Sequence, residues 1–365
     1  MKTINEKYAK LLARYSMGIR KGDKVLICGS YLAESLVREV YKEAIIAGAY
    51  PEIKLSIPGT EKIFYEYACD DQLKYISPAQ KLYYNEYDCL LNIDSPFNLK
   101  ELQNVDPTRK QAVSIARTEL NKIFMERSAA GKFRWTLCVH PTNSGAQEAG
   151  MSLNEYEDFV YSACFLNDDD PVASWKQLAQ RQQKVVDVLN KTTHIEYKSE
   201  DVDIKFTTQG RTWINSCGTF NMPCGEVFTT PVEDSVNGKV RFSYPGIFMG
   251  QEIEDITLEV KDGLVVKWDA KKGKALLDKV FEIEGARRFG EAAVGTNKGI
   301  DKFTRNMLFD EKIGGTIHMA VGAAYPETGG RNESSIHWDL LADMKKDSYI
   351  KADGQIVYKN GEFVL

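Results

Sequence analysis

The chain has 365 residues, of which 43% are hydrophobic and 27% are charged, and this ordinary composition excludes the collagen-like, disordered and coiled-coil classes. The length exceeds the usual size of one hydrophobic core, so we expect two domains, with a single large enzyme domain as the alternative. The net charge is −5 and no dense lysine or arginine run is present, which argues against nucleic acid as the main partner.

The first half of the chain alternates short apolar runs that favour strands with longer amphipathic stretches. It begins with a predicted helix over residues 4–15, followed by a strand over 24–30 and a helix over 32–49. Further strands are predicted over residues 51–57, 88–94 and 134–141. Strands that alternate with helices pair in parallel, so this half predicts an α/β domain with a Rossmann-like parallel sheet.

The second half of the chain has a different, β-rich pattern. A predicted helix over residues 168–194 connects the two halves. Beyond it, alternating runs joined by Asp-Gly and Asn-Gly turns predict β-hairpins over 256–268 and 355–365, and one helix is predicted over 273–283. The fold class is therefore α/β plus α+β. The expected domains are an N-terminal α/β domain, residues 1–190, and a C-terminal β-rich domain, residues 191–365, which carries the candidate metal site.

The cellular location follows from charges and cysteines. Charges interrupt the first 24 residues throughout, and no later segment approaches the roughly 18 apolar residues of a membrane span. We therefore expect neither a secretion signal nor a membrane segment. The seven cysteines are odd in number and lack CxxC spacing, which favours free thiols over a disulfide framework. A cytoplasmic protein is expected.

Two of the four histidines, His318 and His337, lie within twenty residues of each other. Apolar residues alternate with His337 and Asp339, so a strand would project the imidazole and the carboxylate from one face. On a helix these side chains would lie about 200° apart and could not easily share an ion, so the interpretation depends on the strand. His318 shares this alternation, and its small neighbours are expected to leave it accessible.

Two glutamates, Glu226 and Glu291, each follow a glycine and precede small or apolar residues. A carboxylate is costly to bury without a partner, and a cation removes that cost. Together with Asp339 and two neutral imidazoles, they suit a pair of divalent ions such as zinc, cobalt or manganese. Structural histidines and simple Gly-Glu turns remain the alternative, because the ligands are dispersed and no HExxH segment is present.

Four segments of the C-terminal half carry a specific set of motifs. They are NMPCGEVFTTP at 221–231, GARRFGEAAVGTN at 285–297, the run from EKIGGTIHMAVG to SSIHWDLL at 311–341, and DGQIVYKNGEF at 353–363. In content, order and spacing they closely resemble the aminopeptidase T and aminopeptidase S family of metallopeptidases. The resemblance is strongest over residues 211–365 and weaker before them.

The resemblance implies a two-metal exopeptidase that forms a homodimer. The sequence differs from the family's common pattern at Cys224, and its loop between Tyr325 and His337 is short compared with some members. Both differences affect the expected shape of the pocket. The implied metal ligands are Glu226, Glu291, His318, His337 and Asp339, and the implied active-site tyrosine is Tyr325.

The implied activity is removal of the N-terminal residue from peptides with a free N-terminus. A water that bridges two divalent ions has its pKa lowered to roughly 7, which makes hydroxide available. Glu291 is assigned as proton shuttle or metal bridge, and Tyr325 as the oxyanion contact. The alternatives are another two-metal amidohydrolase or deacylase, and a non-catalytic small-ligand-binding protein with a structural metal.

Overall fold

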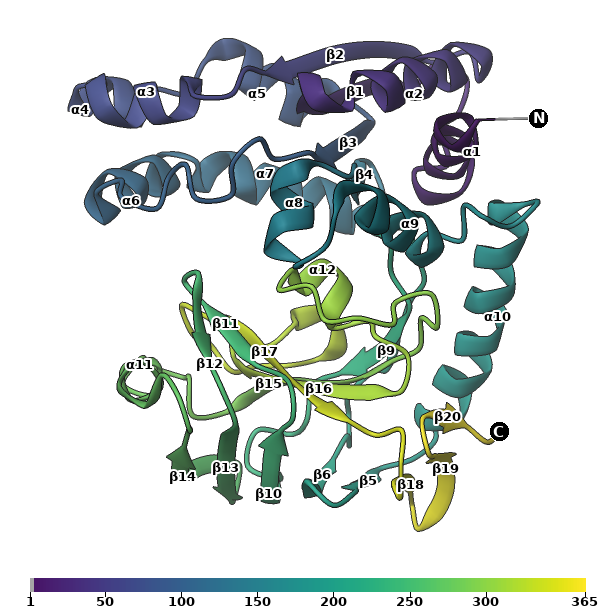
Figure 1. The fold of residues 1–365 in the computed structure, drawn as a ribbon, viewed down its shortest axis with the longest axis vertical. Helices are drawn as coiled ribbons and strands as arrows, with labels where there is room; N and C mark the ends of the chain where they lie inside the picture. Colours follow the sequence, from purple (N-terminus) through teal and green to yellow (C-terminus); the bar gives the residue numbers. More distant parts are fainter. Residues whose placement is uncertain (1–2) are drawn as a thin grey trace. The chain divides into compact units, whose positions relative to one another are not determined.

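A computed structural model describes residues 3–365 of the chain, which divides into two compact units (Figure 1). Unit 1 comprises Met1–Ser174 and Gly218–Pro223, and unit 2 comprises Trp175–Cys217 and Cys224–Leu365. The domain boundaries expected from the sequence stay a prediction, because compactness alone does not show that a part folds independently. Among the described residues, no helix is long and apolar enough to cross a membrane.

Unit 1 is built on a parallel sheet with the strand order β2-β1-β3-β4-β8. The chain runs from β1 to β2 on one side of β1, and then places β3 on the other side. The strand order therefore reverses between β1 and β3, as in doubly wound folds. The Rossmann-like parallel sheet predicted from the sequence is confirmed. The strands are β1 Lys24–Ser30, β2 Tyr50–Ser56, β3 Cys89–Asp94, β4 Arg134–Val139 and β8 Asn221–Met222.

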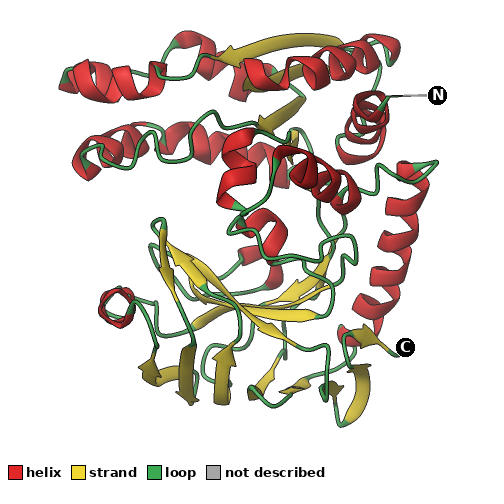
Figure 2. Ribbon diagram, in the orientation of Figure 1, coloured by secondary structure: helices red, strands yellow, loops and turns green. Residues whose placement is uncertain are grey.

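Helices follow or precede the strands of this sheet (Figure 2). Several begin with a side-chain cap, for example Thr3 and Ser152, whose hydroxyls accept a hydrogen bond from the backbone three residues later. The helices of unit 1 are α1 Ile4–Leu11, α2 Glu34–Ile46, α3 Thr60–Tyr67, α4 Asp70–Lys74, α5 Pro78–Glu86, α6 Pro107–Ala116, α7 Thr118–Ala129, α8 Asn143–Glu148 and α9 Leu153–Ala163, with short π and 3₁₀ segments η1 Leu12–Ser16 and η2 Tyr31–Ala33. The long helix α10 Pro171–Leu189 begins at the end of unit 1 and belongs to unit 2 from Trp175 onward.

Unit 2 contains an eight-stranded sheet, order β14-β13-β10-β6-β5-β18-β19-β20, a five-stranded sheet, order β17-β16-β15-β9-β7, and the pair β11-β12. Both predicted hairpins are confirmed, and their turn residues Asp262 and Asn360 have positive φ angles. The elements are β5 His194–Lys198, β6 Val202–Thr207, β7 Ile214–Ser216, β9 Glu226–Thr229, β10 Asn237–Phe242, β11 Gly246–Phe248, β12 Gln251–Ile253, β13 Ile256–Lys261, β14 Leu264–Asp269, α11 Lys274–Val280, β15 Phe289–Gly295, α12 Met307–Asp310, β16 Thr316–Gly322, η3 Pro326–Thr328, β17 His337–Asp343, β18 Tyr349–Ala352, β19 Gln355–Lys359 and β20 Glu362–Phe363.

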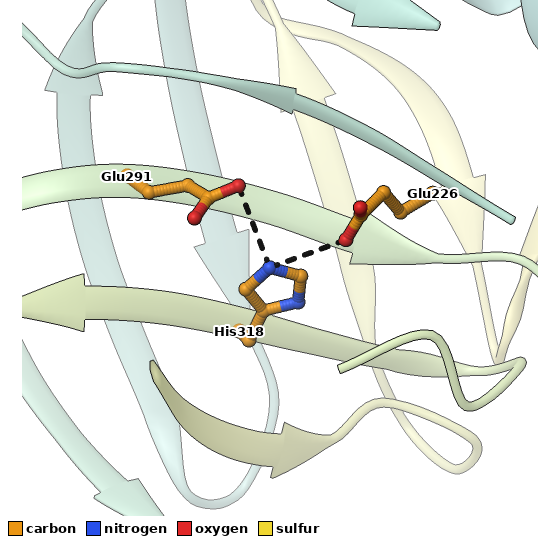
Figure 3. A group of neighbouring side chains, drawn as sticks. All are labelled: Glu226, Glu291 and His318. Carbon is orange, nitrogen blue, oxygen red and sulfur yellow. Dashed lines mark ion pairs between the residues drawn. The ribbon is translucent and has the colours of Figure 1, made fainter. Parts of the chain in front are cut away.

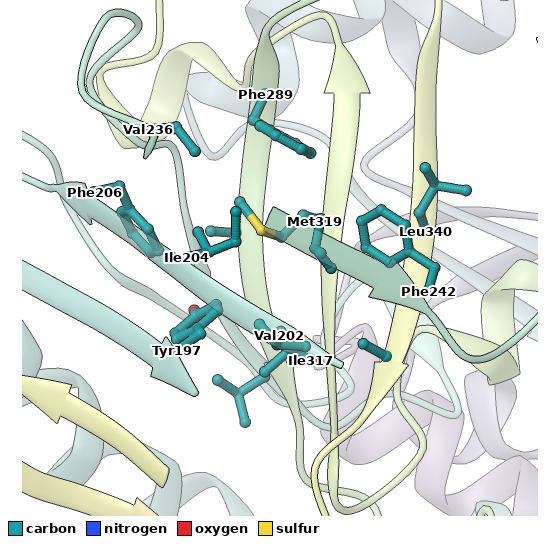
Figure 4. Close-up of a cluster of buried hydrophobic side chains, with 14 of the residues drawn as sticks. Tyr197, Val202, Ile204, Phe206, Val236, Phe242, Phe289, Ile317, Met319 and Leu340 are labelled. Atoms are coloured by element: carbon teal, nitrogen blue, oxygen red, sulfur yellow. The ribbon is translucent and has the colours of Figure 1, made fainter. Parts of the chain in front are cut away.

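The hydrophobic core of unit 2 is shared by the two large sheets (Figure 4). From the five-stranded sheet, Ile317 and Met319 of β16 and Leu340 of β17 enter this core. From the eight-stranded sheet, Ile204 of β6 and Phe242 of β10 join them. Because side chains alternate along a strand, the residues between these core positions on β16 and β17 must project from the opposite face of the five-stranded sheet.

Truncation of a central core side chain tests this arrangement. We expect Met319→Ala to lower the free energy of unfolding by about 2 to 5 kcal/mol, because Met319 is fully buried and its loss leaves a cavity. Urea denaturation followed by circular dichroism measures the change. The matched control is Val266→Ala on β14, where the side chain is 56% exposed. Equal midpoints for the two variants would contradict the assigned core.

Candidate metal centre

The face of the five-stranded sheet that points away from the core carries the polar cluster. The register pairs Glu291 of β15 with Ala320 of β16, and Ala320 with Asp339 of β17. Cross-strand partners share a face, so both carboxylates project from the same side. His318 and His337 lie two residues from Ala320 and Asp339 respectively, and therefore project from this face as well.

Small residues make room for these side chains. Ala293 pairs with His318, and Ala320 lies between Glu291 and Asp339. The fourth strand, β9, adds Glu226, which pairs with Gly295 at the end of β15. The floor of the cluster is therefore made of alanine and glycine, above which longer ionisable side chains converge.

The five predicted ligands form one continuous cluster. His318 Nε2 lies 3.5 Å from Glu226 Oε2 and 3.6 Å from Glu291 Oε1, and Figure 3 shows both carboxylates turned toward that nitrogen. His337 Nε2 lies 3.0 Å from Glu291 Oε2 and 3.5 Å from Asp339 Oδ1. Glu291 thus presents one oxygen to each histidine. The structure brings all five side chains together.

Three overlapping sets of potential metal ligands occur in the part of the chain that the structure describes, and within each set the ligand atoms lie within 4.8 Å of one another. Two of these sets share Glu291. The third set introduces a residue that the sequence analysis did not select. The sets are Glu226, Glu291 and His318; Glu291, His337 and Asp339; and Glu311, His318 and Asp339.

The donor atoms fit a divalent cation because several of them have no hydrogen-bond partner. Glu226 Oε2, His318 Nε2 and Asp339 Oδ1 are buried without a hydrogen bond within the described chain. Each buried polar atom without a partner costs about 1 to 3 kcal/mol, and a bound cation would offset that cost. The expected accessibility of His318 is wrong with respect to solvent, since the residue is only 1% exposed.

The ring of His337 is oriented by the backbone. Its Nδ1 lies 2.7 Å from the carbonyl oxygen of Ala323, so Nδ1–H donates there and Nε2 faces the carboxylates. A carbonyl behind a histidine ligand fixes the ring and its tautomer. This contact favours His337 as a ligand through Nε2.

Electrostatics within the cluster favour positive charge. Burial lowers the pKa of His337, but its contacts with Asp339 and Glu291 outweigh burial and raise the pKa to about 11. Burial also opposes protonation of His318, and Glu291 and Glu226 again raise its pKa. Burial raises the pKa of Glu226, whereas contact with His337 outweighs burial and lowers that of Asp339. Protons or a cation must therefore balance these carboxylates.

Tyr325 lies beside this cluster, just before η3. Its ring centroid is 4.7 Å from that of His337 and 5.4 Å from that of Phe228. Burial, followed by the charges of Glu291 and Asp339, raises the pKa of the phenol, so its hydroxyl stays protonated and can donate a hydrogen bond. Cys224 belongs to none of the potential ligand sets among residues 3–365, and its Sγ lies 2.9 Å from Ser216 Oγ.

Glu311 and Lys312 were missed by the sequence analysis. Lys312 is fully buried, and its Nζ lies 3.5 Å from Glu226 Oε1 and contacts Glu311. A buried ammonium beside two carboxylates offsets part of their charge. The available signal was a pair of charged residues directly before the Ile-Gly-Gly turn that leads into β16, inside one of the motif segments.

Comparison with known proteins places the whole chain among one group of enzymes. A family model described as thermophilic metalloprotease (M29) matches residues 1–363. Aminopeptidase 2 of Geobacillus stearothermophilus is 29% identical, with 99% of this chain and 97% of that protein covered. Aminopeptidase AmpS of Bacillus subtilis is 27% identical, with 98% of each covered.

Solved structures show the same fold. That of AmpT from Thermus thermophilus has a TM-score of 0.84 at 23% identity and covers 99% of both chains. A 2,5-dihydroxypyridine dioxygenase from Pseudomonas putida matches 99% of this chain and 96% of its own with a TM-score of 0.57 at 12% identity. At these identities the likeness concerns the fold alone.

Metal uptake should release protons. With a pKa of about 11, His337 is protonated at pH 7, so it must lose its proton before Nε2 can bind zinc, cobalt or manganese. Calorimetric titrations at pH 7 in buffers of different ionisation enthalpy measure the number of protons released. We expect fewer protons from His337→Gln than from the unchanged chain. Equal binding enthalpies in all buffers would contradict the assignment.

Removal of the buried ammonium should destabilise unit 2. Lys312→Met keeps the length of the side chain but leaves Glu226 and Glu311 without their counter-ion, and breaking such a buried pair costs about 3 to 5 kcal/mol. Thermal unfolding in excess chelator measures the loss, with the exposed Lys302→Met as control. An unchanged melting temperature for Lys312→Met would show that Lys312 does not balance this charge.

Proposed function

This chain belongs to the M29 family of thermophilic metalloproteases and is therefore a metal-dependent peptide hydrolase, and we propose that it is an aminopeptidase that removes the N-terminal residue of peptides. One observation carries the proposal in this chain. Glu291 presents one carboxylate oxygen to His318 and the other to His337, inside a buried cluster with Glu226 and Asp339.

We assign two divalent ions per subunit, zinc, cobalt or manganese, to this cluster. The shared position of Glu291 in two ligand sets and the buried atoms without hydrogen bonds support two ions. Divalent ions in such a site supply a water of lowered pKa and polarise the scissile carbonyl. The proposed ligands are Glu226, Glu291, His318, His337 and Asp339.

The side chains of the chain itself carry the remaining steps. We assign Glu291, which presents one oxygen to each histidine, either as the shuttle that carries the proton of the attacking water to the leaving amine or as the bridge between the ions. The phenolic hydroxyl of Tyr325 donates a hydrogen bond to the developing oxyanion, because its raised pKa keeps it protonated. The carbonyl of Ala323 holds the His337 ring in position throughout.

The free N-terminus of the substrate explains the exopeptidase specificity. A buried surplus of carboxylates favours an α-ammonium or α-amine, whereas an acylated N-terminus offers neither. Peptides with a free N-terminus are therefore the proposed substrates. A homodimer and a cytoplasmic location complete the proposal, and sedimentation analysis tests the first of these.

Exchange of one carboxylate tests the assignment of Glu291. We expect Glu291→Gln to lower the rate of aminoacyl-anilide hydrolysis by about 10²- to 10⁴-fold, because the amide cannot accept the proton. The matched control is Glu333→Gln, at an exposed position without a role in the cluster. Full activity of Glu291→Gln after reloading with metal would reject the role.

Chelation distinguishes the proposed activity from its alternatives. Metal analysis is combined with anilide assays before chelation, after chelation, and after addition of zinc, cobalt or manganese. Loss and recovery of anilide hydrolysis are expected. Hydrolysis of N-acylated amines in place of free aminoacyl substrates would favour an amidohydrolase or deacylase, and a folded, metal-loaded chain without any hydrolysis would favour a binding protein.

A further inference from the structure

Unit 1 contains a cavity of about 770 Å³ at the carboxyl ends of its parallel strands. The cavity is lined by β1, β2, β3 and β4 and by one side of α5 and α7. It opens where the strand order reverses between β1 and β3. In open α/β sheets this reversal leaves a crevice beyond the strand ends, which is where such folds hold small ligands.

The register shows that one face of the sheet becomes polar toward the cavity. Paired residues of neighbouring strands share a face, so polarity can be followed row by row. Three rows of paired residues run toward the cavity. The first row is apolar on β1 and β3, the second is mixed, and the third carries hydroxyl groups. Asp94 lies on the same face of β3, two residues beyond Asn92. The rows, from β2 through β1 to β3, are Glu52, Leu26 and Leu90; Lys54, Cys28 and Asn92; and Ser56 and Ser30.

Asp94 provides a carboxylate that a positively charged ligand group would neutralise. It ends β3, lines the cavity and is largely buried. Burial raises the pKa of its carboxyl, and no charge or hydrogen bond within the described chain opposes that effect. By contrast, the hydroxyls of Ser30 and Ser95 lie 2.9 Å apart, and Ser30 Oγ also donates to the Ser95 carbonyl. These serines join the carboxyl ends of β1 and β3, whereas the carboxylate of Asp94 has no hydrogen bond to any residue that the structure describes.

A positive charge lies on the other side of β1. Lys54 of β2 lines the same cavity, and its Nζ lies 5.8 Å from the centroid of the Tyr83 ring. Because β2 and β3 flank β1, their backbones lie about 10 Å apart at normal strand spacing. Lys54 and Asp94 therefore line the cavity with opposite charges, from strands on the two sides of β1. Glu61, Glu101 and Arg117 also line the cavity, but from helices and loops.

The remainder of the lining is apolar. Leu26, Leu90, Leu120 and Phe133 are buried beneath the cavity. At its edge, large hydrophobic side chains are exposed to solvent, with exposed fractions between 41% and 68%. These edge residues are Leu55, Ile57, Phe97 and Leu99. A ligand with an apolar side chain would cover this surface and gain from its burial.

We propose that this cavity binds a small zwitterion with an apolar side chain, either a free α-amino acid or a short peptide. Asp94 receives the ammonium group, Lys54 receives the carboxylate, and the leucine-lined floor receives the side chain. A nucleotide fits less well, because Asp94 repels phosphate and the segment from β1 into α2 has a single glycine, Gly29 within β1, in place of a glycine-rich phosphate loop. The proposal concerns unit 1 and does not depend on the function assigned to the metal centre.

Calorimetric titration of the full chain in excess chelator tests the proposal, since chelation prevents hydrolysis of the probes. We expect L-leucine or leucylglycine to bind, and the tighter of the two identifies the source of the ligand. Leucinamide lacks the carboxylate and N-acetylleucine lacks the ammonium group, so each should bind at least tenfold more weakly. Binding of adenosine monophosphate but not of leucine or leucylglycine would overturn the proposal.

Variants assign the binding to this cavity. Asp94→Asn should weaken leucine binding at least tenfold, whereas Asp71→Asn, an exposed aspartate of α4, should leave it unchanged. Lys54 is exposed, so Lys54→Met is expected to fold even if Asp94→Asn does not. Lys54→Met should bind leucine and leucinamide equally well, because the contact to the carboxylate is lost. Unchanged leucine binding by Asp94→Asn, or an unchanged preference in Lys54→Met, would overturn the proposal.

The metal centre is separated from this cavity by one further variant. Glu291→Gln should bind leucine as tightly as the unchanged chain does. If Glu291→Gln did not bind leucine, the ligand would be assigned to the metal centre and the proposal would be overturned. Metal-loaded Asp94→Asn should hydrolyse anilides at the unchanged rate, because Asp94 belongs to none of the three sets of potential metal ligands. Failure of the proposed function would appear as absent hydrolysis by the unchanged chain, and would leave the titrations unaffected.

Discussion

The burial of several carboxylates in one small volume is the constraint on which unit 2 depends. Glu226, Glu291 and Asp339 are each less than 10% exposed, although ionised groups are strongly solvated in water. Their mutual repulsion is balanced by two imidazoles and by the buried ammonium of Lys312. A cation-binding function explains this arrangement, because buried charged groups contribute little to the stability of a hydrophobic core.

The two faces of one sheet separate stability from chemistry. On β16, Ile317 and Met319 pack in the core, while His318 between them joins the ionisable cluster. The same alternation along β17 places Leu340 in the core and Asp339 in the cluster. Because the core residues hold the strands in register, they also set the spacing of the ligand atoms. The geometry of the candidate metal centre therefore depends on the hydrophobic packing of the opposite sheet face.

Unit 1 places its polar groups by a different rule. Its strands β1 and β3 are apolar in their first half and become polar toward their carboxyl ends, and Asp94 of β3 and Lys54 of β2 line a cavity there. Main-chain direction, which is common to all strands of a parallel sheet, gathers these ends on one edge. The chain thus combines a candidate metal centre on a sheet face with a cavity at a sheet edge.

Local sequence patterns determined much of this protein. Alternation predicted that His337 and Asp339 share a strand face, and the Asp-Gly and Asn-Gly pairs predicted both hairpins, because these features depend on neighbours a few residues apart. The motif set also identified the five side chains that the fold brings together. Tertiary structure alone decided the rest. The two-residue strand β8 joins the sheet of unit 1 from within the C-terminal half, and Lys312 meets Glu226 across more than eighty residues. Such contacts join segments that are far apart in the chain and leave no periodic signal in either, so only the folded chain reveals them.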